Sequence, residues 1–582
     1  MITNYFKIGF RILIRQRSYT VLNILGLSIG IAVFVFIYLY VQSEIRYDRY
    51  WSDSKNIYRV WNEYSLEGKV EKVAISPFRL AGTLKKNFPE VVEATKLFFT
   101  DPSDVNDMSS LTYNGKVYEV PNITLSDSGL FRIFNYKFFE GDPRTALSKP
   151  NSMVISAKVA RQLFGNEKAV GKKLKTVRRE YTVTGVFDKN TCPTHLDFDA
   201  VVSEYSLSPK SLQKMNSDWF WLGVYTYVKL ADTVSPESFE KRANDFISKQ
   251  ISAFIDSANI NIDGYMVYSL EPVRSIHFNT SLAYDSPSNT NSGYLIIFSI
   301  IAGFILLTAS INYINLAMAR SLKRAKEVGM RKVLGAFRKQ LAMQYISEAF
   351  IVVFIAFILA LSLVELLMPW FNALVGKNLT LVGNLFSRQG IVFGLLLIFM
   401  MIILAVVSGI FPAFILSRYN PANVLKGNNF FININGKRGI SAGGIRKVLV
   451  VIQYVVSIGM IIATMIIFSQ MKFLKNYDPG FDEKNIIVIN TPDDTAYYQQ
   501  ADEFKIELKA IPGVIGVSTA NNAPGYTYGK SLFHAGDTSD KALQTLSLYI
   551  VDTGFFNVLK IPLVEGKFFD SKMETDTGHY YI

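Results

Sequence analysis

The stretch that decides the fold is RSLKRAKEVGMRKVLGA, residues Arg320–Ala336, a strongly basic segment between two long apolar runs. Leu322, Ala325, Gly329 and Val333 recur at spacings of three and four, so they would share one face of a helix. Most of the charged residues fall on the rest of its circumference. The pattern therefore predicts an amphipathic helix that lies at the inner surface of a membrane and docks on a partner.

A plainer alternative remains open, because a basic loop between two spans can serve only to fix the topology of the chain. Glu327 precedes Arg331 by four positions, but such a solvated ion pair contributes only about 0.2–0.5 kcal/mol. Gly329 and Gly335 each cost a helix about 1 kcal/mol against alanine. We therefore expect these glycines to mark a close backbone approach and a helix end.

The composition is that of a membrane protein. Of the 582 residues, 49% are hydrophobic and only 19% are charged, with a mean hydropathy of +0.20. Five uncharged stretches reach the length of about 20 residues that a spanning helix needs. They are Val21–Val41, Gly293–Ala319, Ala349–Val364 with its flanks, Ile391–Leu416 and Val448–Met471.

The distribution of charge orients these spans. Segments 1–20, 318–343 and 417–447 together carry a charge of +17, whereas the whole chain carries +13, so the remainder carries −4. The positive-inside rule assigns the three basic segments to the cytoplasm. We expect a multi-pass protein of the plasma (inner) membrane with a cytoplasmic amino terminus, in contact with membrane lipid. The excess of basic over acidic residues thus reflects membrane topology, and it predicts no nucleic-acid partner.

The expected layout alternates between the two sides of the membrane, with two large domains outside. In chain order it comprises a basic interfacial segment (1–20), a first span (21–42), an extracytoplasmic core domain (43–292), a second span (293–319), a cytoplasmic coupling segment (320–343), a third span (344–368), a short outer loop (369–390), a fourth span (391–416), a cytoplasmic loop (417–447), a fifth span (448–471) and a second, incomplete extracytoplasmic domain (472–582).

The outward region mixes strand-like and helix-like patterns. Strands are expected at Ile57–Trp61, Tyr181–Phe187, Val224–Leu230 and Tyr265–Leu270, and helices at Pro77–Phe88, Ala157–Phe164 and Pro236–Phe254. The predicted fold class is therefore a membrane protein with α-helical transmembrane spans and α+β extracytoplasmic domains.

An internal repeat runs through the chain. Asp127–Gly141, DSGLFRIFNYKFFEG, aligns without gaps on Asp552–Gly566, DTGFFNVLKIPLVEG. Ser28-Ile29-Gly30 near the start of the chain recurs as Ser457-Ile458-Gly459 at a similar offset. The repeating unit would be one span, one outward domain and three further spans. Because the second copy stops inside its outward domain, we expect a truncated chain or gene fragment.

No motif for catalysis, metal binding or a cofactor stands out. A single cysteine excludes a disulfide framework, and Cys192 with His195 forms a lone C-x-x-H, whereas zinc needs three or four ligands. The loop Gly525–Ser531 has three residues between its glycines where a phosphate-cradling loop has four. We therefore expect a non-catalytic chain without metal or cofactor.

The segment Arg324–Ala336 resembles the R-x-K-E-[IV]-G-x-R-K-x-x-G-A signature of FtsX-like permeases, the membrane subunits of MacB-type ABC transporters. Shorter stretches extend the resemblance over nearly the whole chain. They are Tyr47–Tyr50, Ile57–Val60, Pro193–Asp199, Gly409–Ala413, Ser417–Pro421 and Gly480–Asp482.

The resemblance implies a MacB-like core domain outside the membrane and a cytoplasmic segment that docks on an ABC ATPase. Because this chain carries no fused ATPase, a separate ATP-binding subunit is implied. The residues expected to contact that subunit are Arg324, Lys326, Glu327, Gly329, Arg331, Lys332 and Gly335.

The function expected from these observations is that of a permease subunit. It would couple ATP hydrolysis by the partner to conformational change of the outward domains, for export or for mechanotransmission. A second permease copy is a further expected partner, and the sequence favours no substrate. The alternatives are a membrane-bound extracytoplasmic sensor or receptor and, with less support, an anchored extracytoplasmic enzyme.

Overall fold

The structure is a computed structural model that divides into two compact units. The first, the membrane unit, comprises Met1–Arg46 and Asn291–Lys475, and the second, the outward unit, comprises Tyr47–Thr290 and Asn476–Ile582. The described residues are 11, 15, 17–66, 69–98, 110–176, 179–189, 193–258, 264–285, 289–323, 330, 333–334, 337–381, 388–417, 433–434, 437–438, 442–489, 495–521, 530–534, 543–547 and 549–568.

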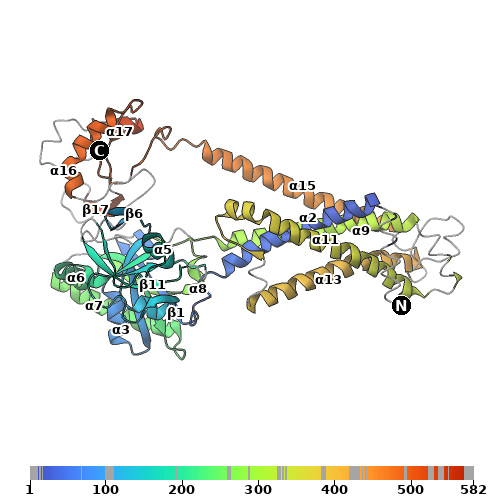
Figure 1. Cartoon of the computed structure of the whole chain (residues 1–582), viewed down its shortest axis with the longest axis horizontal. Coiled ribbons are helices and arrows are strands. Elements are labelled where there is room, and N and C mark those ends of the chain that lie inside the picture. The colour runs from blue at the N-terminus through green and yellow to red at the C-terminus, as the bar shows by residue number, and fades with distance from the viewer. Residues whose placement is uncertain are drawn as a thin grey trace. The chain divides into compact units, whose positions relative to one another are not determined.

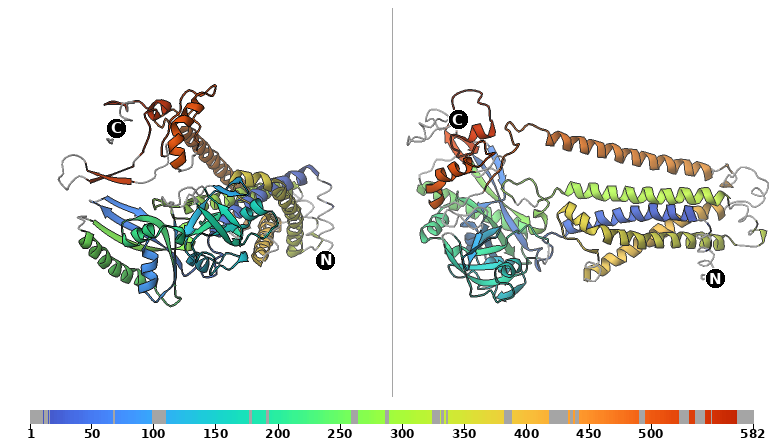
Figure 2. Two further views of the ribbon diagram at one scale, coloured as in Figure 1. Left: turned by 60° about the vertical axis from the view of Figure 1, so that its left-hand side comes forward. Right: turned by 45° about the horizontal axis from the view of Figure 1, so that its top comes forward.

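The membrane unit consists of long apolar helices (Figures 1 and 2). They are α2 (Arg17–Ile45), α9 (Ser292–Lys323), α11 (Arg338–Val375), α13 (Arg388–Ser417) and α15 (Ala442–Lys475), with a two-stranded ribbon of β15 (Asn433–Ile434) and β16 (Lys437–Arg438). Within the described residues, Arg17–Ile45, Ser292–Ala319, Gln340–Val375 and Arg446–Lys475 are long and apolar enough to cross a membrane, and Ile391–Val407 is a shorter apolar helix. These stretches overlap the five expected from hydropathy, and the exact domain boundaries stay a prediction.

Small residues let α2 approach α9 closely. A Cβ atom added to Gly30 would lie only 2.7 Å from the Cβ of Ala309 on α9. In a bilayer, helices associate through van der Waals packing of such small residues, because lipid is as apolar as a side chain. Leu27, Ile31 and Val35 of α2 are buried in the core that forms around this contact.

Polar side chains connect further helices of the membrane unit. Asn315 of α9 donates a hydrogen bond from Nδ2 to Oε1 of Gln453 on α15, at 3.4 Å, and so links the two helices. At the end of α11, the Lys377 ammonium binds the Glu44 carboxylate of α2 and lies 5.2 Å from the Tyr40 ring centroid. These contacts hold neighbouring helices in a defined position along each other's axes.

The outward unit is built on a twisted mixed sheet with helices packed on it (Figure 1). Its strands are β1 (Ile57–Leu66), β2 (Lys69–Val73), β3 (Ser76–Pro77), β4 (Val91–Phe98), β5 (Ser110–Tyr113), β6 (Lys116–Glu119), β7 (Ile123–Ser126), β8 (Phe138–Gly141), β9 (Ser152–Ser156), β10 (Lys173–Lys175), β11 (Glu180–Phe187), β12 (Ala200–Ser203), β13 (Leu222–Leu230) and β14 (Gly264–Pro272). The strand order is β14-β1-β13-β4-β7-β12-β9-β11-β10-β5-β6, with β2, β3 and β8 pairing beside this path.

The helices of this unit are α3 (Leu80–Asn87), α4 (Gly129–Ile133), α5 (Ala157–Phe164), the 3-10 turn η2 (Glu204–Ser206), α6 (Pro209–Ser217), α7 (Pro236–Ala258) and α8 (Val273–Ile276). Further along the chain lie α16 (Thr495–Lys509), β17 (Lys530–His534), β18 (Leu543–Ser547) and α17 (Phe555–Leu559). The four strands and three helices expected from periodicity are all present, with ends shifted by a few residues, and the α+β fold class is confirmed.

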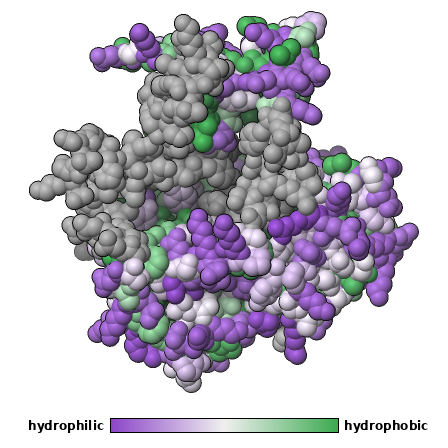
Figure 3. Space-filling model, turned by 90° about the vertical axis from the view of Figure 1, so that its left-hand side faces the viewer, coloured by the Kyte–Doolittle hydropathy of each residue, from purple (hydrophilic) through white to green (hydrophobic). Residues whose placement is uncertain are grey.

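Amphipathic patterns explain where the core lies. α5 begins at the Ser156 cap, whose hydroxyl accepts a hydrogen bond from Val159 N, and it buries Val159, Leu163 and Phe164 against the sheet. α7 buries Phe239 and Ile247 with the strands at the other end of the sheet. The face drawn in Figure 3 is mostly hydrophilic where described residues are visible, as expected for a domain in water.

The internal repeat is visible in the local structure. Oδ1 of Asp127 accepts hydrogen bonds from Gly129 N and Thr95 Oγ1, and Oδ1 of Asp552 accepts them from Gly554 N and Ser518 Oγ. A short helix follows each aspartate, α4 in the first copy and α17 in the second. The glycines that close the aligned segments have φ values of +85° and +94°. The matching residues therefore make the same turn, which supports duplication.

The close approach at Gly30 leads to a prediction. Gly30→Ala places a methyl group against Ala309, and we expect it to destabilise the membrane unit by about 1–3 kcal/mol, as overpacking does. Gly303→Ala on α9 is the matched control, because an added Cβ there meets nothing within 4 Å. The control should gain up to about 1 kcal/mol from helix propensity. Thermal unfolding of the detergent-solubilised chain measures both, and equal melting temperatures would contradict the packing argument.

Candidate functional site

The residues expected to dock on an ATPase fall outside the described part of the chain. Arg324, Lys326, Glu327, Gly329, Arg331, Lys332 and Gly335 are all among the residues that the structure does not describe. Their role stays a prediction.

The described residues of the same segment add an apolar component. Leu334 N donates a hydrogen bond to Met330 O at 3.0 Å, as in a helical turn. Met330, Val333, Leu334 and Phe337 are exposed by 54%, 67%, 86% and 73%. Met330, Val333 and Leu334 have the spacing of one helix face, and Phe337 is the N-cap of α11, with an extended backbone. The docking site predicted from the sequence rests on charged residues and glycines. It gives no role to Met330, Leu334 or Phe337, although their spacing in the sequence could have identified them.

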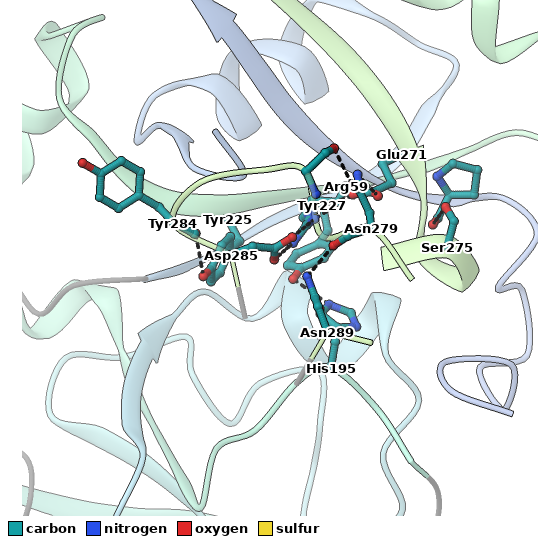
Figure 4. A network of polar contacts seen from close by, with 12 residues as sticks. Arg59, His195, Tyr225, Tyr227, Glu271, Ser275, Asn279, Tyr284, Asp285 and Asn289 are labelled. Carbon is teal, nitrogen blue, oxygen red and sulfur yellow. Dashed lines mark hydrogen bonds and ion pairs between the residues drawn. The ribbon is translucent and has the colours of Figure 1, made fainter. Parts of the chain in front are cut away.

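A second candidate site is a buried polar network in the outward unit (Figure 4). Its centre is Arg59 on β1, whose side chain is 1% exposed. Strand register explains the position of Arg59, since it lies opposite Tyr227 of β13 on one side and opposite Glu271 of β14 on the other. Directly opposed residues in antiparallel strands have their side chains within contact distance.

Arg59 binds two carboxylates at once. Its Nε and Nη2 donate to Oε2 of Glu271 at 3.1 and 2.7 Å, and its Nη2 donates to Oδ2 of Asp285 at 2.8 Å. Asn279 Nδ2 donates to the other oxygen of Glu271 at 2.7 Å. Both carboxylates are about as buried as the guanidinium, with side chains 6% exposed. The network is therefore a desolvated charge cluster with hydrogen bonds to its charged groups.

A chain of hydrogen bonds adjoins Arg59 on the β13 side. His195 Nε2 lies 2.7 Å from the Tyr227 hydroxyl, and His195 Nδ1 lies 2.8 Å from Oδ2 of Asp48. Oδ1 of Asp48 accepts hydrogen bonds from Thr194 Oγ1 and Trp51 Nε1. His195 is thus a buried structural histidine, and no metal role is needed to account for it. Cys192 lies outside the described residues, and within the described part no group of three metal-binding side chains occurs.

The charge states in this network follow from its contacts. Burial alone would raise the pKa of Asp48, but the charge and hydrogen bond of His195, with the bonds from Thr194 and Trp51, hold that pKa below its usual value. Burial would lower the pKa of Arg59, but Asp285 and Glu271 raise it above its usual value. Burial raises the pKa of Tyr227 well above its usual value. The cluster therefore keeps Asp48 ionised, Arg59 protonated and Tyr227 neutral near pH 7.

The network holds the two chain segments that adjoin spans in the sequence. Tyr47 follows α2 by two residues, and its ring stacks on His277 with centroids 3.6 Å apart. His277 O accepts a hydrogen bond from Thr290 N, two residues before α9 begins. Asn289 Nδ2 donates to Asn279 O at 2.8 Å. The exit from the first span and the entry to the second are thus tied to the same corner of the sheet.

Sequence reasoning named parts of this site without giving them a role. Tyr47–Tyr50, Ile57–Val60 and Pro193–Asp199 carried the family resemblance, and the structure brings all three together around Asp48, Arg59 and His195. Glu271 and Asp285 were missed. Neither lies in a recognisable motif, and Asp285 stands 226 positions from Arg59.

Two domain families match this chain. Residues 20–246 match the MacB-like periplasmic core domain, and residues 299–421 match the FtsX-like permease C-terminal domain. The first match covers the network's β1 and β13 residues, and the second covers the coupling segment.

Individual relatives match over part of their length. The chain is similar to the macrolide export ATP-binding/permease protein MacB of Bdellovibrio bacteriovorus, with 22% identity over 41% of this chain and 36% of that protein. It is also similar to the uncharacterized ABC transporter permease YknZ of Bacillus subtilis, with 23% identity over 42% of this chain and 57% of that protein. The match thus spans about a third to just over half of these relatives.

Two solved structures match part of the chain. The periplasmic region of MacB from Actinobacillus actinomycetemcomitans matches 37% of this chain and 89% of its own length, with 15% identity and a TM-score of 0.26. The extracellular domain of the ABC-type transporter YknZ matches 37% of this chain and all of its own length, with 18% identity and a TM-score of 0.25.

The two domain families occur here in one chain, whose described residues include four helices long and apolar enough to span a membrane. Together the matches identify the chain as an FtsX/MacB-like permease of the ABC-transporter type, with a MacB-like core domain and an FtsX-like domain.

Proposed function

We propose that this chain is the non-catalytic permease subunit that couples ATP hydrolysis by a separate cytoplasmic ABC ATPase to movement of its outward domain, for export or mechanotransmission. It would reside in the inner membrane with its amino terminus in the cytoplasm. The observation that carries the proposal is a cationic sequence between α9 and α11 whose described residues, Met330, Val333, Leu334 and Phe337, are all apolar and exposed. The FtsX-like match over residues 299–421 favours this function over a sensor or receptor.

The docking step uses both kinds of side chain. Met330, Leu334 and Phe337 would fill an apolar groove on the ATPase, because several large exposed apolar side chains within a short segment are typical of an interface. Arg331 and Lys332 would pair with carboxylates around that groove and set its orientation. Gly329 and Gly335 would allow the backbone to approach the partner closely.

The transmission step uses the buried network of the outward unit. A shift of the first span pulls on Tyr47 and Asp48, which follow α2, and a shift of the second pulls on Asn289 and Thr290, which precede α9. The first pair connects to β13 through His195, and the second connects to β14 through Asn279, in both cases by hydrogen bonds. A packed polar corner of this kind passes displacement to the sheet instead of absorbing it.

The first prediction concerns docking. Replacing Arg331 and Lys332 together by glutamate should abolish co-purification with the ATPase encoded beside this gene, because four units of charge change at the interface. Leu334→Ala should weaken the complex by about 1–3 kcal/mol, as expected for truncation of one interfacial anchor. Affinity pull-down and stimulated ATPase activity of the purified pair measure the effect.

The matched control makes the same charge reversal at Lys437 and Arg438, in the second basic segment between spans. This variant should retain the complex, because the proposal places the contact at residues 324–337. If both double variants bind the ATPase as the natural chain does, or both lose binding equally, the docking assignment fails.

A second prediction concerns the network. Arg59→Ala leaves Glu271 and Asp285 buried without their cation, and we expect a loss of about 3–5 kcal/mol of unfolding free energy. Chemical unfolding of the full chain in detergent, followed by tryptophan fluorescence, reports on the outward unit through Trp51 and Trp219, which are buried there. Arg49→Ala removes an exposed arginine nearby and should change little.

A triple variant distinguishes the effect of the buried charges from the effect of side-chain volume. Arg59→Met combined with Glu271→Met and Asp285→Val replaces the buried charges by hydrophobic side chains of roughly similar volume, so it should recover much of the lost stability. With stability recovered, stimulated ATPase activity should persist while the activity of the whole transporter falls, because the corner is no longer rigid. Full transport activity in this variant would contradict a transmitting role for the charge network.

A further inference from the structure

A polar pocket of about 330 Å³ lies in the outward unit, apart from the Arg59 network. Its walls come from α3, β4, the start of α4, the loop before β9 and the turn η2. The lining residues are Ala81, Gly82, Lys85, Glu93, Ala94, Lys96, Asp127, Ser128, Arg132, Arg144, Ser148, Glu204 and Tyr205. A cavity of this volume accommodates a small organic ligand.

The carboxylates of the pocket are largely occupied. Glu93 binds Lys85 through one oxygen and accepts a 2.5 Å hydrogen bond from Arg132 Nε through the other. Burial would raise the pKa of Glu93, but these two cations hold it below its usual value, so Glu93 is ionised and neutralised in place. Glu204 lies 3.0 Å from Lys96 Nζ, and both are nearly buried.

Asp127 is also engaged, because its Oδ1 accepts hydrogen bonds from Thr95 Oγ1 and Gly129 N, each at 2.7 Å. Four cations line the pocket against three carboxylates, Glu93, Glu204 and Asp127. With every group ionised, the site carries one net positive charge, and burial raises the pKa of Glu204, which lowers the negative charge further.

The pocket has more hydrogen-bond donors than its own acceptors use. Among the described residues, Arg132 is paired only through Nε, and its side chain is 39% exposed, so both Nη groups can reach a ligand. Within the described part of the chain, the Arg144 guanidinium has no partner. Ser128 is 8% exposed, and its hydroxyl is buried in the pocket wall without a hydrogen-bond partner among the described residues. Buried hydroxyls are normally hydrogen-bonded, so this one points to a missing partner at the site.

We propose that this pocket binds the carboxylate or phosphate group of a small anionic ligand, held by the guanidinium groups of Arg132 and Arg144. Planar guanidinium groups match the oxygen geometry of both anions and bind them bidentately. Glu93 positions Arg132 by holding its Nε, which leaves the fork of Nη1 and Nη2 for the ligand. The site lies entirely in the outward unit, and it does not depend on docking of an ATPase.

The test titrates inorganic phosphate and, separately, succinate into the full chain in a neutral detergent, with calorimetry and thermal unfolding as readouts. At least one anion should bind saturably and raise the melting temperature, because a ligand that binds only the folded state stabilises it. Tetramethylammonium chloride at equal ionic strength is the control for salt. Binding of phosphate alone or of succinate alone assigns the preferred group.

Two variants localise the binding. Arg144→Gln and Arg132→Gln should each lower the affinity for the anion by about tenfold or more, as loss of a charge-assisted contact does. Arg161→Gln is the matched control, because Arg161 is an exposed arginine of α5 outside the pocket. Arg144→Lys should restore only part of the affinity, since it keeps the charge but loses the fork.

The proposal is overturned if neither anion binds saturably below about 10 mM, a range in which even weak specific sites are filled. It is also overturned if Arg144→Gln and Arg132→Gln bind as the natural chain does, or if Arg161→Gln weakens binding equally. Thermal unfolding without anion checks that each variant is folded.

Discussion

The outward unit depends on one desolvated cation, Arg59, held between two buried carboxylates. Charges that are this buried remain stable only while their partners stay in position. The requirement fixes β1 between β13 and β14, because Tyr227 and Glu271 stand directly opposite Arg59. It also fixes the segment that carries Asp285, which lies seven residues before α9. A hydrophobic residue at position 59 could fill the same space, but it would accept several arrangements of that segment.

The elements that could be predicted from the sequence are those with a local signal. Apolar runs of spanning length identified the regions of the long helices, and alternation identified β1, β11, β13 and β14. The turn at Asp127 and its copy at Asp552 were found because the aspartate, glycine and aromatic residues keep the same spacing. These signals are properties of a short window, so they do not require knowledge of tertiary contacts.

The polar network could not be predicted in the same way. Its members come from five separated parts of the chain, and strand register decides which of them meet. Arg59 belongs to a short motif that follows the first span, where a charged side chain is expected to be exposed. In the structure it is nevertheless the most deeply buried cation of the network. His195 was considered with Cys192 because they are neighbours in sequence, but its actual partners are Asp48 and Tyr227. The docking residues at 324–335 were found through a resemblance, and the structure does not describe them.

The contact between Gly30 and Ala309 sets a limit on how the membrane unit can move. Where two helices touch almost backbone to backbone, no side chain lies between them that could change rotamer and let one helix slide along the other. A piston-like stroke of α2 past α9 would have to lift the two helices apart at that point. The two helices are better suited to tilt together as one rigid pair, with α2 and α9 turning about the point where they meet.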